Sequence, residues 1–383
     1  MNASPLRVVV ADDSPFVCRL LASYLASAPG IEVAATAPTG ARALELVRAL
    51  RPDVVTLDLE MPVLDGLEAL ERIMAETPTP AVVISGVSGR AAGRTLAALE
   101  AGAVDFVLKF APQAGPDPEA LRCEIVAKVR AAARVRVIRS IARRRPAAGP
   151  AAVPAAASPA AAGRSAAPPS PPPPAPALGL AGGRRTPPGG VVVIGASTGG
   201  PVAVRELLTD LPADFPAAVL VVQHLPATFT RVLAAQLARR VALAVREARE
   251  GDPLEPGTVL VAPGGFHVVF RPDLRVGLVP GPEVHGHCPA CDVTMQAAAQ
   301  AFGGRARGVV LTGMGSDGTQ GLMAIRARGG RTFAQDAASC VVAGMPQRAI
   351  ERGLVDAVGS PSEIARWLAL DEATPARARR EAC

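Results

Sequence analysis

A serine on a glycine-rich turn is the first candidate for chemistry in this sequence. Ser197 lies in a Gly-x-Ser-x-Gly pattern, directly after the apolar run Val191–Ile194 and before a helical pattern that starts at Pro201. A sharp strand-to-helix turn lifts a hydroxyl clear of the sheet and points free N–H groups at the place where an oxyanion forms. Ser197 is therefore a candidate nucleophile, with a merely tight or phosphate-binding glycine turn as the alternative.

A serine nucleophile needs a general base, and the sequence has four histidines. His224 ends an apolar run, as Ser197 does, so we expect both at strand ends of one sheet. An acid on the far ring nitrogen would fix the tautomer and stabilise the imidazolium. Asp317 follows another strand pattern among glycines and is the candidate for that role, with Asp292 as the alternative. The geometry of the turn also makes the N–H of Thr198 a candidate oxyanion donor.

A second group of polar residues follows strand patterns in the first 128 residues. Asp12 and Asp13 follow one strand, Asp58 ends another, and Ser85 and Lys109 end two more. Three carboxylates at one sheet edge repel each other unless a cation lies among them, and oxygen ligands suit Mg²⁺. A lysine and a hydroxyl that face the same point can bind a phosphoryl group. The set predicts an aspartate site that accepts a phosphoryl group.

Alternating strands and helices must position both groups. Such alternation predicts two doubly wound parallel-sheet α/β domains, with functional residues at the carboxyl ends of the strands. We expect one domain at residues 4–128, its last helix extending as far as about residue 145, and a second at residues 189–372. Residues 146–188 are mostly Ala, Pro, Gly and Ser, which predicts a disordered linker. The strands are expected at Leu6–Ala11, Val33–Ala37, Val54–Leu57, Ala81–Ile84 and Val104–Leu108, and at Val191–Ile194, Ala218–Gln223, Thr258–Ala262, Val309–Thr312 and Arg331–Ala334.

Composition narrows the function classes. The net charge is +6, but much of it lies between Arg130 and Arg145, where no aromatic residue is interleaved, so we expect no nucleic-acid binding. No apolar run of about 18 residues and no signal pattern are present, which favours a cytoplasmic protein without membrane insertion. Six cysteines spread over two domains do not indicate a disulfide framework.

One short stretch suggests a different function. Residues 285–291, HGHCPAC, place two histidines and two cysteines within seven residues. These are zinc ligands, but full zinc sites usually draw on two separated clusters, and four neighbours on one loop rarely close a tetrahedron. Metal binding by this stretch is an alternative hypothesis.

The first domain resembles the receiver domain of two-component response regulators. Residues 8–14 (VVVADDS), 57–66 (LDLEMPVLDG) and 102–109 (GAVDFVLK) carry the resemblance. It implies that Asp58 accepts the phosphoryl group, with a histidine kinase as donor. It also implies that Asp12, Asp13 and Asp58 bind Mg²⁺, with the Glu60 carbonyl as a further ligand.

The same resemblance assigns the residues that respond to phosphorylation. Ser85 and Phe106 would form a switch pair, and Lys109 would be the partner of the phosphate. The family usually has a proline after this lysine, whereas this chain has Phe110. A cis bond is costly without proline, so we expect a trans bond at that position.

The second domain is similar to the protein-glutamate methylesterases of bacterial chemotaxis, the CheB family. The motifs GASTGG at 195–200, QHLP at 223–226 and LTGMGSDG at 311–318 carry the similarity, with AQDAASCVV at 334–342 and GMP at 344–346 downstream. It implies hydrolysis of glutamate methyl esters, and deamidation of glutamines, on chemoreceptor cytoplasmic helices without a cofactor. Ser197 would be the nucleophile, His224 the base, Asp317 its orienting acid and the Met314 N–H an oxyanion donor.

The joint resemblance implies control of the enzyme by phosphorylation, with the resting receiver covering the catalytic site. The rival hypothesis is an interaction module, in which phosphorylation of Asp58 changes partner binding and the second domain is catalytically silent.

Overall fold

The computed structural model describes residues 4–109, 118–135 and 189–373. The expected trans bond at Phe110, the linker at 146–188 and the arginine-rich stretch 136–145 lie outside the described residues. Among the helices that are described, none combines the length and the apolar character needed to cross a membrane.

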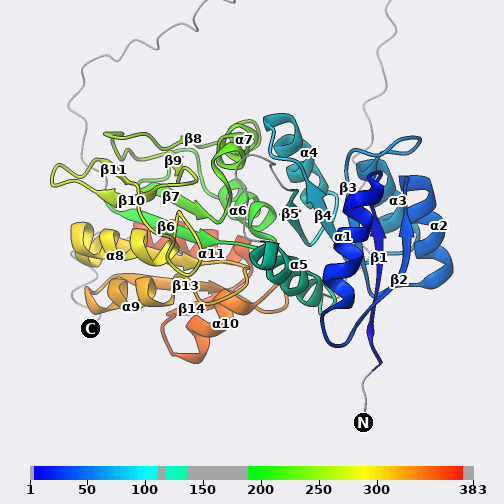
Figure 1. Ribbon diagram of the computed structural model, residues 1–383. Coiled ribbons are helices and arrows are strands. Elements are labelled where there is room, and N and C mark those ends of the chain that lie inside the picture. Colours follow the sequence, from blue (N-terminus) through cyan, green and yellow to red (C-terminus); the bar gives the residue numbers. More distant parts are fainter. Residues whose placement is uncertain (1–3, 110–117, 136–188, 374–383) are drawn as a thin grey trace, which may run out of the picture. The chain divides into compact units, whose positions relative to one another are not determined.

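The first domain is built on five parallel strands in the order β2-β1-β3-β4-β5. Alternate residues of β1 face opposite layers, because successive side chains of a strand point to opposite faces. Val8 and Val10 pack with α1 and α5, whereas Val9 and Ala11 pack with α2, α3 and α4. The elements are β1 Leu6–Ala11, α1 Pro15–Ala26, β2 Ile31–Ala37, α2 Gly40–Leu50, β3 Val54–Asp58, α3 Gly66–Glu76, β4 Ala81–Ser85, α4 Gly89–Glu100, β5 Asp105–Leu108 and α5 Pro118–Ala132 (Figure 1).

Short polar side chains start the helices that follow the strands of this domain. Ser14 accepts a hydrogen bond from the N–H of Val17, and Asp65 accepts one from the N–H of Glu68. Such caps satisfy helix N–H groups that have no partner within the helix. They fix each helix start next to the end of the preceding strand, where the polar residues of the site lie.

The second domain is built on seven parallel strands in the order β14-β13-β12-β6-β7-β9-β8, with a separate hairpin of β10 and β11. Strand order reverses between β6 and β12, which is where doubly wound folds place their sites. Helices cover both faces (Figure 1). The elements are β6 Val191–Ala196, α6 Gly200–Thr209, β7 Ala218–Gln223, α7 Ala227–Leu237, β8 Ala244–Glu247, β9 Thr258–Val261, β10 His267–Phe270, β11 Val276–Val279, α8 Cys291–Phe302, β12 Ala306–Val310, α9 Thr319–Ala327, β13 Arg331–Gln335, α10 Gly344–Glu351, β14 Ala357–Gly359 and α11 Pro361–Ala373.

The predicted pair of parallel-sheet α/β domains is confirmed. The sequence interpretation missed the edge strands β8 and β14, strand β11 and helix α11. The missed strands are only three or four residues long, and none of them is buried throughout. They therefore lack the continuous apolar run that marks a central parallel strand.

Substitution of Gly66 tests the close packing of α3 on β3. A Cβ added to Gly66 would lie 1.9 Å from the carbonyl oxygen of Asp58 and 2.8 Å from the Cα of Leu59. Because both are backbone atoms, we expect Gly66→Ala to destabilise the receiver domain by ~1–3 kcal/mol. Hydrogen exchange of receiver peptides in the full chain measures this.

The matched control for that substitution is Gly93→Ala in α4. A Cβ added to Gly93 would meet nothing within 4 Å. The alanine should therefore stabilise the helix by ~0.5–1 kcal/mol. Wild-type protection of the β3 and α3 peptides in Gly66→Ala would contradict the packing described here.

Candidate functional site

The backbone of Ser197 is held by residues from two neighbouring strands. Its N–H donates to the carbonyl oxygen of Thr312 at 3.0 Å. Its carbonyl oxygen accepts from Nε2 of Gln223 at 2.8 Å. The hydroxyl of Thr312 donates to the carbonyl oxygen of Thr198 at 2.9 Å. Residues at the ends of β7 and β12 therefore fix the position of this turn and of the Ser197 backbone.

Glycines in the turn leave room for these contacts. Gly199 has φ of +75°, and a Cβ there would lie 2.6 Å from the side chain of Val341. A Cβ on Gly200 would lie 2.0 Å from Oε1 of Gln223. The glycine pattern therefore follows from close packing as well as from backbone conformation.

His224 and Asp317 meet directly. His224 follows β7, its N–H donates to the carbonyl oxygen of Ala196 at 3.1 Å, and its Nε2 lies 2.8 Å from Oδ2 of Asp317. Both side chains are buried, at 3% and 2% exposure. Asp292, the alternative acid, lies elsewhere: its Oδ2 is 3.0 Å from Nε2 of His285. The structure therefore places Asp317, rather than Asp292, on His224.

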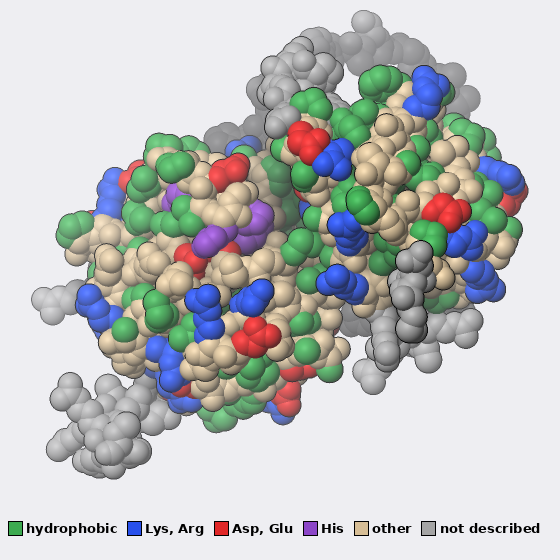
Figure 2. All heavy atoms as spheres, turned by 60° about the horizontal axis from the view of Figure 1, so that its bottom comes forward, with side chains coloured by type: hydrophobic (Ala, Val, Ile, Leu, Met, Phe, Trp, Pro, Cys, Tyr) green, Lys and Arg blue, Asp and Glu red, His purple; other side chains and the backbone are tan. Residues whose placement is uncertain are grey.

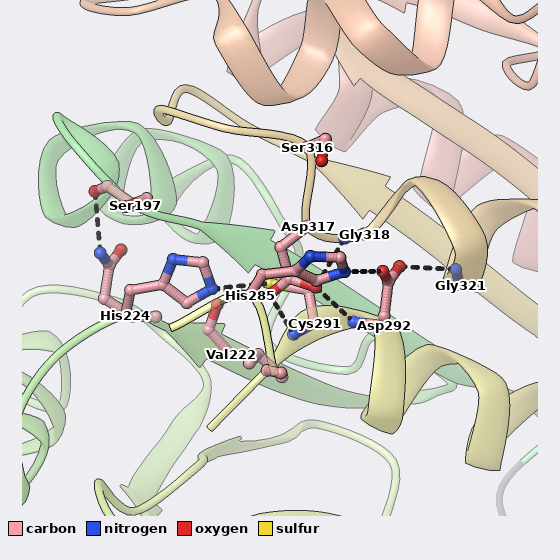
Figure 3. A network of polar contacts seen from close by, with 12 residues as sticks. Ser197, Val222, His224, His285, Cys291, Asp292, Ser316, Asp317, Gly318 and Gly321 are labelled. Atoms are coloured by element: carbon pink, nitrogen blue, oxygen red, sulfur yellow. Dashed lines mark hydrogen bonds and ion pairs between the residues drawn. The ribbon is translucent and has the colours of Figure 1, made fainter. Parts of the chain in front are cut away.

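The carboxylate of Asp317 also accepts three backbone hydrogen bonds. The N–H of Cys291 donates at 2.7 Å, and those of Asp292 and Gly318 donate at 2.9 Å each (Figure 3). Burial opposes ionisation, but the hydrogen bond and charge of His224, with the N–H groups of Asp292 and Cys291, outweigh it and lower the pKa of Asp317 to about 2. Asp317 is therefore an anion in a fixed orientation.

The contact with Asp317 determines which nitrogen of His224 remains for a role as candidate base. Because Nε2 faces Asp317, Nδ1 is the remaining nitrogen. In the described part of the chain, Nδ1 is buried without a hydrogen-bond partner, and the hydroxyl of Ser197 does not bond it. Catalytic hydrogen bonds are often long before substrate binds. The acid thus holds Nε2 here, whereas in the chymotrypsin-type triad it holds Nδ1.

Two candidate oxyanion donors lie in loops beside Ser197. Thr198 directly follows Ser197, and Met314 follows Gly313, whose Cα is so close that an added Cβ would lie 2.8 Å from the Cβ of Ser197. Among the described residues, neither the N–H of Thr198 nor that of Met314 has an intramolecular acceptor. Both N–H groups are available for an incoming oxygen.

The stretch 285–291 borders the site, but its two histidines and two cysteines do not come together at one point. His287 stacks on His224, with ring centroids 3.7 Å apart and planes at 16°. Burial, and next the neighbouring His224, lower the pKa of His287 to about 4, so this ring is neutral near pH 7. Figure 2 shows histidine side chains gathered on one face of the molecule. Buried His267 clamps the loop, since its Nε2 lies 3.0 Å from the carbonyl oxygen of Pro282 and its Nδ1 accepts from the N–H of Ala290 at 3.2 Å.

Several residues at the site were not assigned from the sequence. Gln223 and Thr312 hold the turn, and His287 and Cys291 contact the candidate base, His224. Gln223 stands inside the QHLP motif next to His224, and this was the only signal in the sequence that pointed to its role.

The carboxylates of the first domain meet at the predicted sheet edge. One oxygen each of Asp12, Asp13 and Asp58 lie within 4.8 Å of one another. Nζ of Lys109 lies 2.9 Å from Oδ2 of Asp12 and 2.7 Å from Oδ2 of Asp58. Burial opposes the charge of Lys109, but hydrogen bonds to Asp58 and Asp12 outweigh it and raise its pKa. Three carboxylates with a single lysine fit a Mg²⁺ ion, which prefers oxygen ligands.

The remaining receiver candidates lie around this cluster. The N–H of Glu60 donates to Oδ1 of Asp58 at 3.2 Å. The hydroxyl of Ser85 bonds that of Thr95 and donates to the carbonyl oxygen of Gly86 at 3.1 Å. Phe106 is buried, at 7% exposure. Ser85 must therefore exchange these partners before it can bond a phosphoryl group.

Known proteins resemble both domains. The family model described as CheB methylesterase matches residues 192–368, and that of the response regulator receiver domain matches residues 8–114. A protein-glutamate methylesterase/protein-glutamine glutaminase of Symbiobacterium thermophilum is 46% identical over 91% of this chain and 92% of its own. One of Nitratidesulfovibrio vulgaris is 45% identical over 94% and 97%. The crystal structure of the Thermotoga maritima CheB methylesterase catalytic domain, 39% identical, covers 47% of this chain and 97% of its own with a TM-score of 0.46.

These matches define the class of protein: a response-regulator receiver joined to a methylesterase domain. The chain belongs to the CheB methylesterase family, since relatives above 40% identity match nearly its full length.

The low pKa of Asp317 predicts how stability depends on pH. Folding lowers this pKa from 3.8 to about 2. The contribution of Asp317 is therefore complete above the unfolded value and is lost as pH falls through the folded one. We expect wild type to exceed Asp317→Asn in unfolding free energy by an amount that shrinks by ~2 kcal/mol between about pH 5 and pH 2.

Urea unfolding followed by the fluorescence of Trp367 measures this difference. Trp367 is the single tryptophan and lies in α11 of the catalytic domain. A difference that stays constant down to pH 2 would show that His224 and the N–H groups do not stabilise the carboxylate.

Proposed function

We propose that this chain hydrolyses methyl esters of glutamate side chains on chemoreceptor cytoplasmic helices and deamidates receptor glutamines. Ser197 is the nucleophile, His224 the base and Asp317 its orienting acid. The observation that carries the proposal is the 2.8 Å contact of His224 with an anionic Asp317, at the strand ends beside the Gly-x-Ser-x-Gly turn. The reaction needs no cofactor in this proposal, and the protein acts in the cytoplasm.

The reaction runs through an acyl-enzyme. The hydroxyl oxygen of Ser197 attacks the ester carbonyl while Nδ1 of His224 takes its proton. The N–H groups of Met314 and Thr198 stabilise the oxyanion. When the intermediate collapses, the imidazolium returns the proton to the leaving methoxide, and methanol departs. Water then repeats both steps and frees the glutamate side chain; with glutamine the leaving group is ammonia.

Control by phosphorylation completes the proposal. Residues 4–128 form the receiver, 146–188 the linker and 189–372 the catalytic domain. A histidine kinase of the chemotaxis system donates the phosphoryl group to Asp58. Asp12, Asp13 and Asp58, with the carbonyl of Glu60, hold Mg²⁺, which neutralises charge during the transfer.

Contacts within the compact unit that contains both domains support occlusion by the resting receiver. The ring of Phe106, the proposed switch residue, stacks on that of Phe229 in α7 with centroids 4.9 Å apart. The hydroxyl of Thr198, next to the nucleophile, donates to a carboxylate oxygen of Asp105. Phosphorylation draws Lys109 and Ser85 toward the new phosphoryl group and moves Phe106, which weakens these contacts.

Ser197→Ala tests the nucleophile. We expect methanol release from methylated receptor membranes to fall to background, because no acyl-enzyme can form. Trp367 fluorescence should show an intact fold. Asp317→Asn should lose on the order of 10⁴-fold in rate, because the amide favours the wrong tautomer of His224. Wild-type methanol release from a folded Ser197→Ala protein would exclude the serine mechanism. An Asp317→Asn enzyme with a rate within about threefold of wild type would show that another residue is the orienting acid.

A small phosphoryl donor tests the control. With Mg²⁺ it should raise the esterase rate of the intact chain by roughly 5- to 30-fold, a typical allosteric coupling. Asp58→Ala should not respond, because it lacks the acceptor carboxylate. Equal responses of wild type and Asp58→Ala would show that activation does not pass through Asp58.

A further inference from the structure

Cys291 brings a thiol to the proposed catalytic base. It is the first residue of α8 and is fully buried. Its Sγ lies 3.6 Å from Nε2 of His224, the nitrogen that faces Asp317. One atom each of His224, Cys291 and Asp317 lie within 4.8 Å of one another. An imidazole nitrogen, a thiol sulfur and a carboxylate oxygen therefore meet at one point.

We propose that His224, Cys291 and Asp317 form a binding site for a thiophilic divalent cation such as Zn²⁺. Imidazole, thiolate and carboxylate are zinc ligands, and tetrahedral bonds of about 2.0–2.3 Å hold two ligand atoms roughly 3.3–3.6 Å apart. The 3.6 Å between Sγ of Cys291 and Nε2 of His224 matches that spacing. The 2.8 Å between His224 and Asp317 must lengthen by about 0.5 Å when the ion replaces the hydrogen between them. The fourth position is left for water.

The three ligands come from separate segments of the fold. His224 follows β7, Cys291 starts α8 and Asp317 precedes α9. Stable zinc sites usually draw ligands from separated segments, which the stretch 285–291 does not do by itself. Within that stretch, His285 pairs with Asp292, and His287 stacks on His224 instead of joining the three ligands.

The site is held in place before any ion binds. The N–H of Cys291 donates to Oδ2 of Asp317 at 2.7 Å, and that of Asp292 donates to Oδ1 at 2.9 Å. These bonds tie the start of α8 to the carboxylate and keep the thiol near the ring. A pocket lined by Ser197, His224, His287 and Cys288 gives access to the ring.

Occupancy by the cation would switch off the base. In the catalytic tautomer, Nε2 of His224 carries a proton toward Asp317, and the lone pair of Nδ1 accepts the proton of Ser197. A Zn–N bond at Nε2 needs the lone pair there, so the ring proton moves to Nδ1. The thiol of Cys291 loses its proton to solvent as the Zn–S bond forms. Nδ1 then carries hydrogen and cannot accept a proton from Ser197.

Co²⁺ reports on the binding site without any activity measurement. We expect Co²⁺ added to the metal-free full chain to give a thiolate-to-metal charge-transfer band that one equivalent of Zn²⁺ removes. Cys291→Ala and the more conservative Cys291→Ser should lose the band, and their affinity for Zn²⁺ should fall at least ~100-fold, since even an outer residue of a metal site contributes 10–100-fold. Trp367 fluorescence establishes that each variant is folded.

Cys288→Ala is the matched control, because Cys288 lies three residues from Cys291 and outside the three ligands. It should keep the band and the wild-type affinity. Loss of the band in Cys288→Ala but not in Cys291→Ala would overturn the ligand set in favour of the stretch 285–291. A folded wild-type chain that binds no Zn²⁺ at micromolar concentrations would overturn the site.

Inhibition is tested separately, because it rests on the proposed function whereas binding does not. Zn²⁺ should abolish methanol release by the wild type, and a chelator should restore it. Cys291→Ala, compared with its own metal-free rate, should need at least ~100-fold more Zn²⁺. Zn²⁺ binding without inhibition would overturn the proposed inhibition but not the proposed binding site. A zinc-free wild type that shows the Co²⁺ band, but has no esterase activity even with the phosphoryl donor and Mg²⁺, would overturn the proposed function alone.

Discussion

The arrangement of the proposed catalytic site depends on the buried carboxylate of Asp317. It accepts hydrogen bonds from His224 and from the N–H groups of Cys291, Asp292 and Gly318. A buried anion is costly unless several donors surround it. The same donors lower the pKa of Asp317 to about 2 and tie the end of β12 to the start of α8. The bonds that stabilise the charge therefore also set the orientation of the imidazole, so the stability of the domain and the geometry of the proposed catalytic site depend on one group.

Parallel topology explains how much of the site the sequence could reveal. Ser197, His224 and Asp317 each follow a buried apolar strand, and carboxyl ends of parallel strands meet at one edge. The same rule located Asp12, Asp58 and Lys109 in the receiver. A continuous run of branched apolar residues is enough to recognise such a strand. The polar residues that follow the run are then the candidates for the site.

The same reasoning could not find groups that reach the site from loops. His287 and Cys291 lie close to His224 because the loop before α8 folds over the sheet edge, fastened by His267. No periodicity in the sequence encodes that path. The sequence also could not show which ring nitrogen of His224 faces Asp317. That choice depends on the backbone at the end of β7. The stretch 285–291 predicted a cluster of zinc-type side chains, but the fold separates them.

The stacking of His287 on His224 places a second imidazole directly against the proposed base. Two imidazolium rings 3.7 Å apart would repel each other strongly in a buried site. Burial and the neighbouring His224 lower the pKa of His287 to about 4, so His287 remains neutral when His224 takes up the proton of Ser197 in the proposed mechanism. In the proposed mechanism Asp317 balances the positive charge of the His224 imidazolium, and His287 limits the rotation of the ring that Asp317 contacts.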